Sequence, residues 1–210
     1  MIYKIRGFIM ETLIPLGEAI KADTDEVVVL DIHSSGGAVS TELFLLNALV
    51  EKKNAGAKIV TVNSGVALSA AARLLVQGKE IYVNPYSVTM FHEAEDSFDT
   101  YLDTVIDWVL TPWYKIKQGK KQDHLTIFNE KMRHLEPWPR ILSHFEENKI
   151  SGDYWVTAEE MLMILDNVKV GFLPDEYREL EVWEPSAEMT MDVTPEMLSQ
   201  IMGGGEEDAS

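Results

Sequence analysis

The chain has 210 residues, enough for one sizeable domain with its own core, and 46% of its residues are hydrophobic. Its 18 Lys and Arg against 35 Asp and Glu give a formal net charge of −17, which argues against nucleic acid and anionic membranes as partners. The absence of cysteine excludes disulfides and thiol chemistry. Without a long apolar run or a secretory signal, the sequence predicts a cytoplasmic protein.

Strands and helices alternate from the start of the chain to residue 92. We expect strands at 2–9, 27–32, 58–62, 80–83 and 88–91, and helices at 11–22, around 43–50 and at 69–77. The run Val27–Ile32 is nearly continuous in β-branched residues, which is typical of a strand buried on both faces. Alternation with short connections predicts an α/β fold of βαβ units around a largely parallel sheet.

Further along, helical periodicity dominates. The pattern predicts a protruding helical section over about 98–150, and the capping-box run Thr157–Glu160 predicts the start of another helix. The tail 203–210 is rich in glycine and acidic residues, so we expect it to be disordered. No linker interrupts the rest, and residues 1–202 are expected to form a single domain.

Ser69, His92 and Asp153 are candidates for a hydrolytic site. Ser69 lies between a predicted strand and a predicted helix, where its hydroxyl could serve as a nucleophile or could simply cap the helix. His92 ends a strand and could act as a general base or be an ordinary polar residue. Asp153 follows a glycine and could orient His92 or be a turn residue.

A glycine pair completes this candidate site. Gly36 and Gly37 follow a predicted strand, where they could form a turn or bring backbone close to a substrate. In the second case the amides of Gly37 and Ala70 would form a two-donor oxyanion hole. The serine segment is not the Gly-x-Ser-x-Gly elbow of α/β-hydrolases, because Leu68 and Ala70 flank the serine and the second glycine is missing.

Over about residues 1–180 the sequence resembles the ClpP-like serine peptidases. Four segments carry the resemblance: Asp31–Val39, Gly65–Ala72, Pro85–His92 and Asp153–Glu160. The resemblance implies Ser69 as nucleophile, His92 as base and Asp153 as the group that orients it. It also implies Gly37 and Ala70 as the oxyanion-hole amides, with no metal or organic cofactor. The implied fold is the ClpP/crotonase-like spiral of βαβ units with a helical handle, in a ring-shaped homo-oligomer that cleaves polypeptides.

The sequence departs from the family pattern in several places. Ser35 and His33 replace the usual proline and asparagine, and the acidic run Glu93–Phe98 replaces a glycine-rich strand, so we expect a remodelled handle. The interval between His92 and Asp153 is longer than in ClpP, which leaves Glu93, Glu95 and Asp96 as alternative sources of the acid. The first strand starts almost at the N-terminus, and the expected lack of axial-pore loops argues against an AAA+ unfoldase as partner.

Two other functions fit parts of the same pattern. A crotonase-type acyl-CoA enzyme would share the fold and the paired amides without needing Ser69, His92 and Asp153 together. An assembly protein without activity would keep the fold as a ring scaffold.

Overall fold

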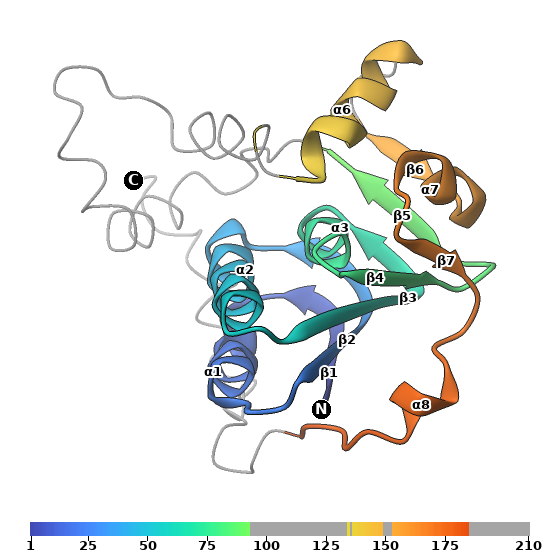
Figure 1. Ribbon diagram of the computed structural model, residues 1–210. Coiled ribbons are helices and arrows are strands. Elements are labelled where there is room, and N and C mark those ends of the chain that lie inside the picture. Colours follow the sequence, from blue (N-terminus) through green and yellow to red (C-terminus); the bar gives the residue numbers. More distant parts are fainter. Residues whose placement is uncertain (93–133, 135, 149–152, 185–210) are drawn as a thin grey trace, which may run out of the picture.

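The computed structural model describes residues 1–92, 134, 136–148 and 153–184 and shows a mixed α/β fold (Figure 1). The elements up to His92 are β1 (Ile2–Ile9), the 3₁₀ turn η1 (Glu11–Leu13), α1 (Ile14–Ala22), β2 (Val27–Gly37), α2 (Val39–Asn54), β3 (Lys58–Leu68), α3 (Ala70–Leu75), β4 (Glu80–Val83) and β5 (Val88–Phe91). Then come α6 (Trp138–Glu147), β6 (Tyr154–Val156), α7 (Ala158–Ile164), β7 (Val168–Val170) and α8 (Asp175–Arg178). Most of the predicted helical section and the acidic tail lie outside the described residues.

The described strands form one sheet in which parallel pairs dominate. Its order is β1-β2-β3-β4-β7, and β5 pairs with β3 and with β6. All these pairs are parallel except that of β5 with β6. The predicted α/β class with a largely parallel sheet is therefore confirmed.

Strand β3 changes its partner half-way along. Residues 60–63 pair with β4, whereas residues 66–68 pair with β5. The buried Asn63 lies at the change, where its Nδ2 atom donates to Val88 O (3.0 Å) and Thr89 Oγ1 (3.1 Å), and its Oδ1 atom accepts from Gly65 N (3.1 Å). This one side chain supplies hydrogen bonds across the gap between the two pairings and directs β5 toward the end of β3.

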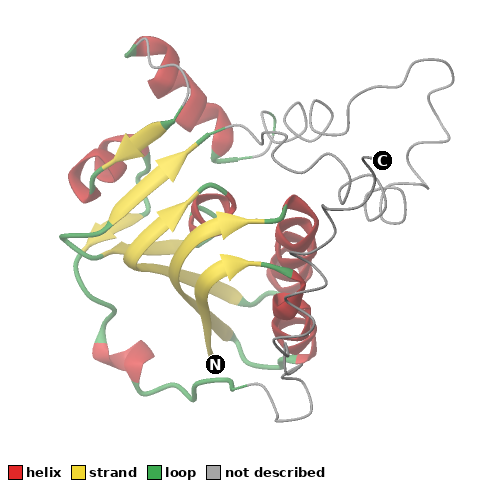
Figure 2. Cartoon of the chain, turned by 180° about the vertical axis from the view of Figure 1, so that it is seen from behind, coloured by secondary structure: helices red, strands yellow, loops and turns green. Residues whose placement is uncertain are grey.

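Helices α1 and α2 and the segment that carries α8 cover opposite faces of the sheet. Val28, Leu30 and Ile32 of β2 belong to the large core beneath the helices, whereas Val29 of the same strand belongs to a second core with Tyr177 of α8. Figure 2 shows α1 and α2 on one side of the strands and the short helix α8 on the other. The two-sided burial predicted for this strand from its β-branched run is confirmed.

Two central strands extend beyond their predicted ends. We expected strands to stop at Ile32 and Val62, but β2 continues to Gly37 and β3 to Leu68. Parallel pairing with Ser34 opposite Ala67 carries both strands on, although their sequence has turned small and polar. The extension brings the glycine pair and Ser69 to the same end of the sheet.

Helix α6 and strand β6 pack beside β5. The rings of Trp138 and Phe91 lie 5.7 Å apart, and the ring of Phe145 lies 4.3 Å from that of Tyr154, so α6 packs on β5 and β6.

The capping box predicted at Thr157 is confirmed, since its side chain accepts from Glu160 N and Glu160 accepts from Thr157 N. Across the described ranges, no helix has the length and apolar character needed to span a bilayer.

Candidate active site

Ser69 occupies a strained turn between β3 and α3. Its backbone has φ 54° and ψ −121°, and among the described residues it alone has a positive φ without being glycine. Such a conformation costs on the order of 1–3 kcal/mol and persists where the surrounding structure enforces it. Ser69 N donates to Met90 O (2.9 Å), and the side chain makes no capping hydrogen bond to α3. The hydroxyl therefore does not cap α3, which was one of the two alternatives that the sequence left open for Ser69.

The Ser69 hydroxyl meets the imidazole of His92. Ser69 Oγ lies 2.6 Å from His92 Nε2, within hydrogen-bond distance. His92 directly follows β5, and β5 runs beside the last residues of β3 with Leu68 opposite Met90. The pairing of these two strands thus sets the serine and the histidine side by side, and a neutral imidazole at this distance can accept the hydroxyl proton.

Asp153 approaches the other imidazole nitrogen without bonding to it. Its Oδ1 atom lies 3.8 Å from His92 Nδ1, and Nδ1 is buried with no hydrogen-bond partner among the described residues. Asp153 precedes β6, whose antiparallel pairing with β5 places Tyr154 opposite Phe91. The structure therefore brings the predicted acid to the correct side of His92 but outside hydrogen-bond range. Glu93, Glu95 and Asp96 lie outside the described residues.

The glycine pair packs against the serine turn on one side and β1 on the other. Gly36 has φ 89°, and a Cβ atom there would lie 2.6 Å from Leu68 O and 2.8 Å from Ser69 Cβ. Gly37 has φ 152°, and a Cβ atom there would overlap with Ile9 O. Both positions therefore require glycine. A Cβ atom on Gly36 would also lie 3.2 Å from the amide nitrogen of Ala70, so β2 runs close to one of the two predicted oxyanion-hole amides.

A comparison with known proteins supports the resemblance to this family. Residues 8–107 match the family model of the Clp protease. This match supports a ClpP-like peptidase. Members of this family are serine-type peptidases that generally form homo-oligomeric rings and act on polypeptides. The matched stretch contains Gly37, Ser69, Ala70 and His92 and ends before Asp153. No curated protein matches the chain.

The stretch that matches the family model also contains a buried ion pair that was not predicted from the sequence. Arg73 and Glu42 are 2% and 0% exposed, and Arg73 additionally donates to the carbonyl oxygen of His92 (3.1 Å). The available signal was an arginine in an otherwise apolar helix, four residues after Ser69. Its partners could not be inferred, because they depend on how α2 packs against α3.

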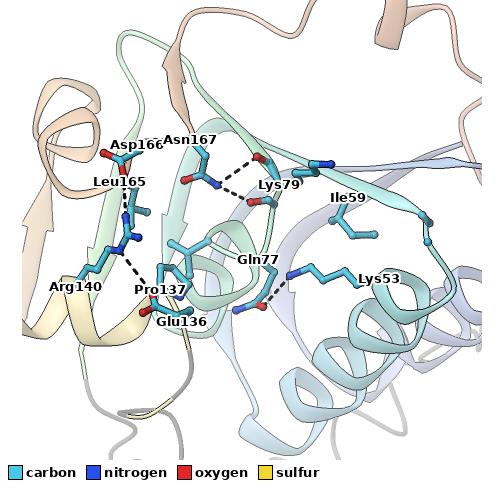
Figure 3. A pocket seen from close by; sticks show the side chains of 14 residues that line it. Lys53, Ile59, Gln77, Lys79, Glu136, Pro137, Arg140, Leu165, Asp166 and Asn167 are labelled. Atoms are coloured by element: carbon cyan, nitrogen blue, oxygen red, sulfur yellow. Dashed lines mark hydrogen bonds and ion pairs between the residues drawn. The ribbon is translucent and has the colours of Figure 1, made fainter.

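A hollow of about 620 Å³ lies near the start of β3, the strand that ends just before Ser69. Figure 3 shows the side chains that line it. Ile59 near the start of β3 lines it, together with Arg140, which pairs with Asp166 (2.9 Å) and Glu136 (3.6 Å). Its cations and anions largely neutralise one another, and no nucleophile with a base lines it. Within the described ranges, no three His, Asp or Glu side chains are grouped to share a metal ion.

Proposed function

We propose that this protein is a serine endopeptidase that uses Ser69 as nucleophile and His92 as general base. The observation that carries the proposal is the 2.6 Å separation of Ser69 Oγ and His92 Nε2 at a strained strand-to-helix turn. The serine-type peptidase family of the domain supports the same chemistry. A positive φ at a serine that does not cap its helix is costly, and a functional constraint explains why it is kept.

The proposed reaction has two halves. Ser69 Oγ attacks the carbonyl carbon of the scissile peptide bond while His92 Nε2 accepts its proton. His92 then gives that proton to the leaving amine, and the acyl group stays on Ser69 as an ester. In the second half His92 takes a proton from water, the hydroxide attacks the ester, and Ser69 regains its proton as the acid leaves.

Neighbouring groups would stabilise the charges that develop. The amide of Ala70 follows the nucleophile, and with the amide of Gly37 it would donate to the carbonyl oxygen as that atom becomes negative. Losing one such donor in known hydrolases costs about 3–4 kcal/mol of transition-state stabilisation. Asp153 would stabilise the imidazolium by moving from 3.8 Å into contact with Nδ1. Catalytic hydrogen bonds are often long before substrate binds, and they tighten in the complex.

A fluorophosphonate probe tests the proposal directly. We expect the wild-type protein to be labelled, peptide mass spectrometry to place the adduct on Ser69, and Ser69→Ala to abolish both labelling and peptide hydrolysis. Ser87→Ala is the matched control, because it removes a buried serine hydroxyl that donates to Asn84 O (2.8 Å) away from His92. This variant should be labelled like the wild type.

Native mass measurement of the same samples tests the proposed ring-shaped homo-oligomer. A folded wild-type protein that resists labelling would refute the peptidase proposal, and intact rings in that sample would favour the assembly protein. Turnover of acyl-CoA that survives Ser69→Ala would instead favour the crotonase-type enzyme.

A further inference from the structure

The ion pair of Glu42 and Arg73 connects three elements around the proposed active site. Glu42 lies in the first turn of α2, and Arg73 lies in α3. Arg73 Nε donates to Glu42 Oε1 (2.5 Å) and Nη2 donates to Oε2 (2.7 Å), a bidentate geometry that fixes the plane of the guanidinium. Arg73 Nη1 donates to His92 O (3.1 Å), so the third element is the end of β5.

Two hydrogen bonds join the segment Ser69–Arg73 to the end of β5. Ser69 N donates to Met90 O (2.9 Å), and the guanidinium of Arg73 reaches His92 O two residues later. Arg73 N also donates to Ser69 O (3.2 Å), so Arg73 lies one helical turn from the nucleophile. The side chain of Arg73 thus fixes the main chain of the base relative to the turn that carries the nucleophile.

His92 needs such a contact because it lies beyond the strand pairing. The last paired residue of β5 is Met90 on the β3 side and Phe91 on the β6 side. Misplacing a reacting group by about 1 Å can cost roughly 100-fold in rate. A hydrogen bond to the carbonyl oxygen of His92 restrains the main chain of the proposed base itself, where a small displacement would change the distance to Ser69 directly.

Stability alone gives little reason for a fully buried ion pair. Desolvating two charges offsets most of their attraction, and apolar residues of similar volume often replace such a pair at no loss of stability. Packing between α2 and α3 could therefore be achieved without charges. What an apolar pair could not supply is the donor to His92 O.

We propose that Arg73 is a positioning residue that fixes His92 for proton transfer from Ser69, and that Glu42 fixes Arg73 in turn. This inference rests on the peptidase function proposed above. Neither side chain touches the substrate in this scheme, and both act through His92.

The decisive variant replaces both charges with apolar side chains, Glu42→Leu with Arg73→Met. We expect it to unfold close to the wild-type temperature. We also expect the maximal rate at which a fluorophosphonate labels Ser69, with loss of fluoride, and the kcat for a peptide to fall about 10- to 100-fold, with KM little changed. A merely structural pair would give wild-type rates once stability is recovered.

Arg73→Lys keeps the inference testable if the double variant fails to fold. A lysine can keep a charge beside Glu42 but cannot also offer the planar fork that reaches His92 O. The expected result is again a lower maximal rate of labelling by the fluorophosphonate. In a His92→Ala background the same change should cause no further loss, because the base that Arg73 positions is absent.

Thr61→Val is the matched control at the other end of α3. The buried hydroxyl of Thr61 donates to Leu75 O (2.6 Å), so this variant weakens the attachment of the same helix without touching His92. We expect lower stability and an unchanged rate of labelling by the fluorophosphonate. If the wild type is labelled and a folded Arg73 variant is labelled equally fast, this inference is overturned while the peptidase proposal stands. A wild type that is not labelled would overturn the peptidase proposal and this inference with it.

Discussion

Asp153 stands beside His92 without a hydrogen bond between them. The Oδ1 atom of Asp153 and the Nδ1 atom of His92 are 3.8 Å apart, and the two side chains are 53% and 18% exposed. The Nδ1 atom of His92 is buried and has no hydrogen-bond partner among the residues that the structure describes. A small movement of the exposed carboxylate would complete the contact, whereas the position of His92 is set by β5 and Arg73.

Replacing Asp153 with asparagine should therefore slow hydrolysis while leaving the fold intact. An amide cannot stabilise an imidazolium as a carboxylate does, and it can favour the wrong tautomer. The corresponding change at a buried, hydrogen-bonded aspartate lowers kcat about 10⁴-fold. We expect a smaller loss here, about 10- to 1,000-fold, because Asp153 is half exposed. Steady-state kinetics on a peptide substrate measure the effect, with KM close to the wild-type value.

An unchanged kcat in Asp153→Asn would contradict its role. Glu93, Glu95 and Asp96 would then be the next positions to replace, since they follow His92 directly in sequence.

Gly36 offers a second prediction, because the serine turn leaves no room for a side chain there. Gly36→Ala would place a Cβ atom 2.6 Å from Leu68 O at a φ of 89°, and at such a site backbone has to shift. We expect a loss of stability of about 1–3 kcal/mol. The displaced turn should also abolish labelling of Ser69 by a fluorophosphonate.

Gly56→Ala separates these two effects. Gly56 has a similar φ of 95°, but a Cβ atom added there would have nothing within 4 Å. Its substitution should cost about 1 kcal/mol from backbone strain alone and leave labelling unchanged. Normal labelling of a folded Gly36→Ala variant would show that the close approach of β2 is irrelevant to the site.

Asn63 is expected to control the site through the path of β5. Asn63→Ala removes three hydrogen bonds from a buried position at which β3 changes partner. Leaving buried partners unsatisfied costs about 1–3 kcal/mol per group, so denaturant unfolding should show clear destabilisation. Because Ser69 and His92 meet through the pairing of β3 with β5, labelling of Ser69 by a fluorophosphonate should also slow at a temperature where the variant is still folded. Labelling at the wild-type rate under those conditions would limit Asn63 to a structural role.

The sequence was informative where local pattern decides structure. β1, β4 and β5 begin and end at the predicted residues, and the capping box at Thr157 starts α7 as expected. Ser69 was recognisable because it lies between a predicted strand and a predicted helix, and His92 because it ends the apolar run of β5. Parallel strands bring their carboxyl ends to one edge of a sheet, which is why the two were expected to meet. Their roles as nucleophile and base stay predictions until labelling is measured.

Long-range contacts between side chains could not be predicted from the sequence. Glu42 and Arg73 are 31 positions apart on different helices, and only the packing of those helices makes them partners. The partner change at Asn63 and the extension of β2 to Gly37 depend likewise on neighbouring strands. The 3.8 Å gap at Asp153 is a matter of side-chain geometry that no spacing rule supplies.

The face of the sheet that α8 covers carries a charged cluster, which leads to a prediction about stability and pH. Glu80 pairs with Lys169 (2.8 Å) and with Lys58, and their hydrogen bonds lower its pKa from 4.5 to about 2. A carboxyl group whose pKa is lower in the folded state stabilises the fold above its unfolded pKa. That contribution is lost as the pH falls from about 4.5 to about 2. Glu80→Gln should therefore lower the free energy of unfolding at neutral pH, by about 1 kcal/mol for a partly exposed pair.

The difference between Glu80→Gln and wild type should shrink as the pH approaches 2, where the carboxylate is protonated in the wild type as well. At alkaline pH the change in stability follows from Lys58, whose pKa is raised mainly by its hydrogen bond to Glu80. Its contribution is complete below the ordinary lysine pKa of 10.5 and is lost only as the pH rises through the higher folded value. Glu26→Gln, at an exposed residue just before β2, controls for the loss of one negative charge. Urea unfolding of the three proteins between acidic and neutral pH tests this directly, and a difference that stays constant over that range would refute the assigned pairing.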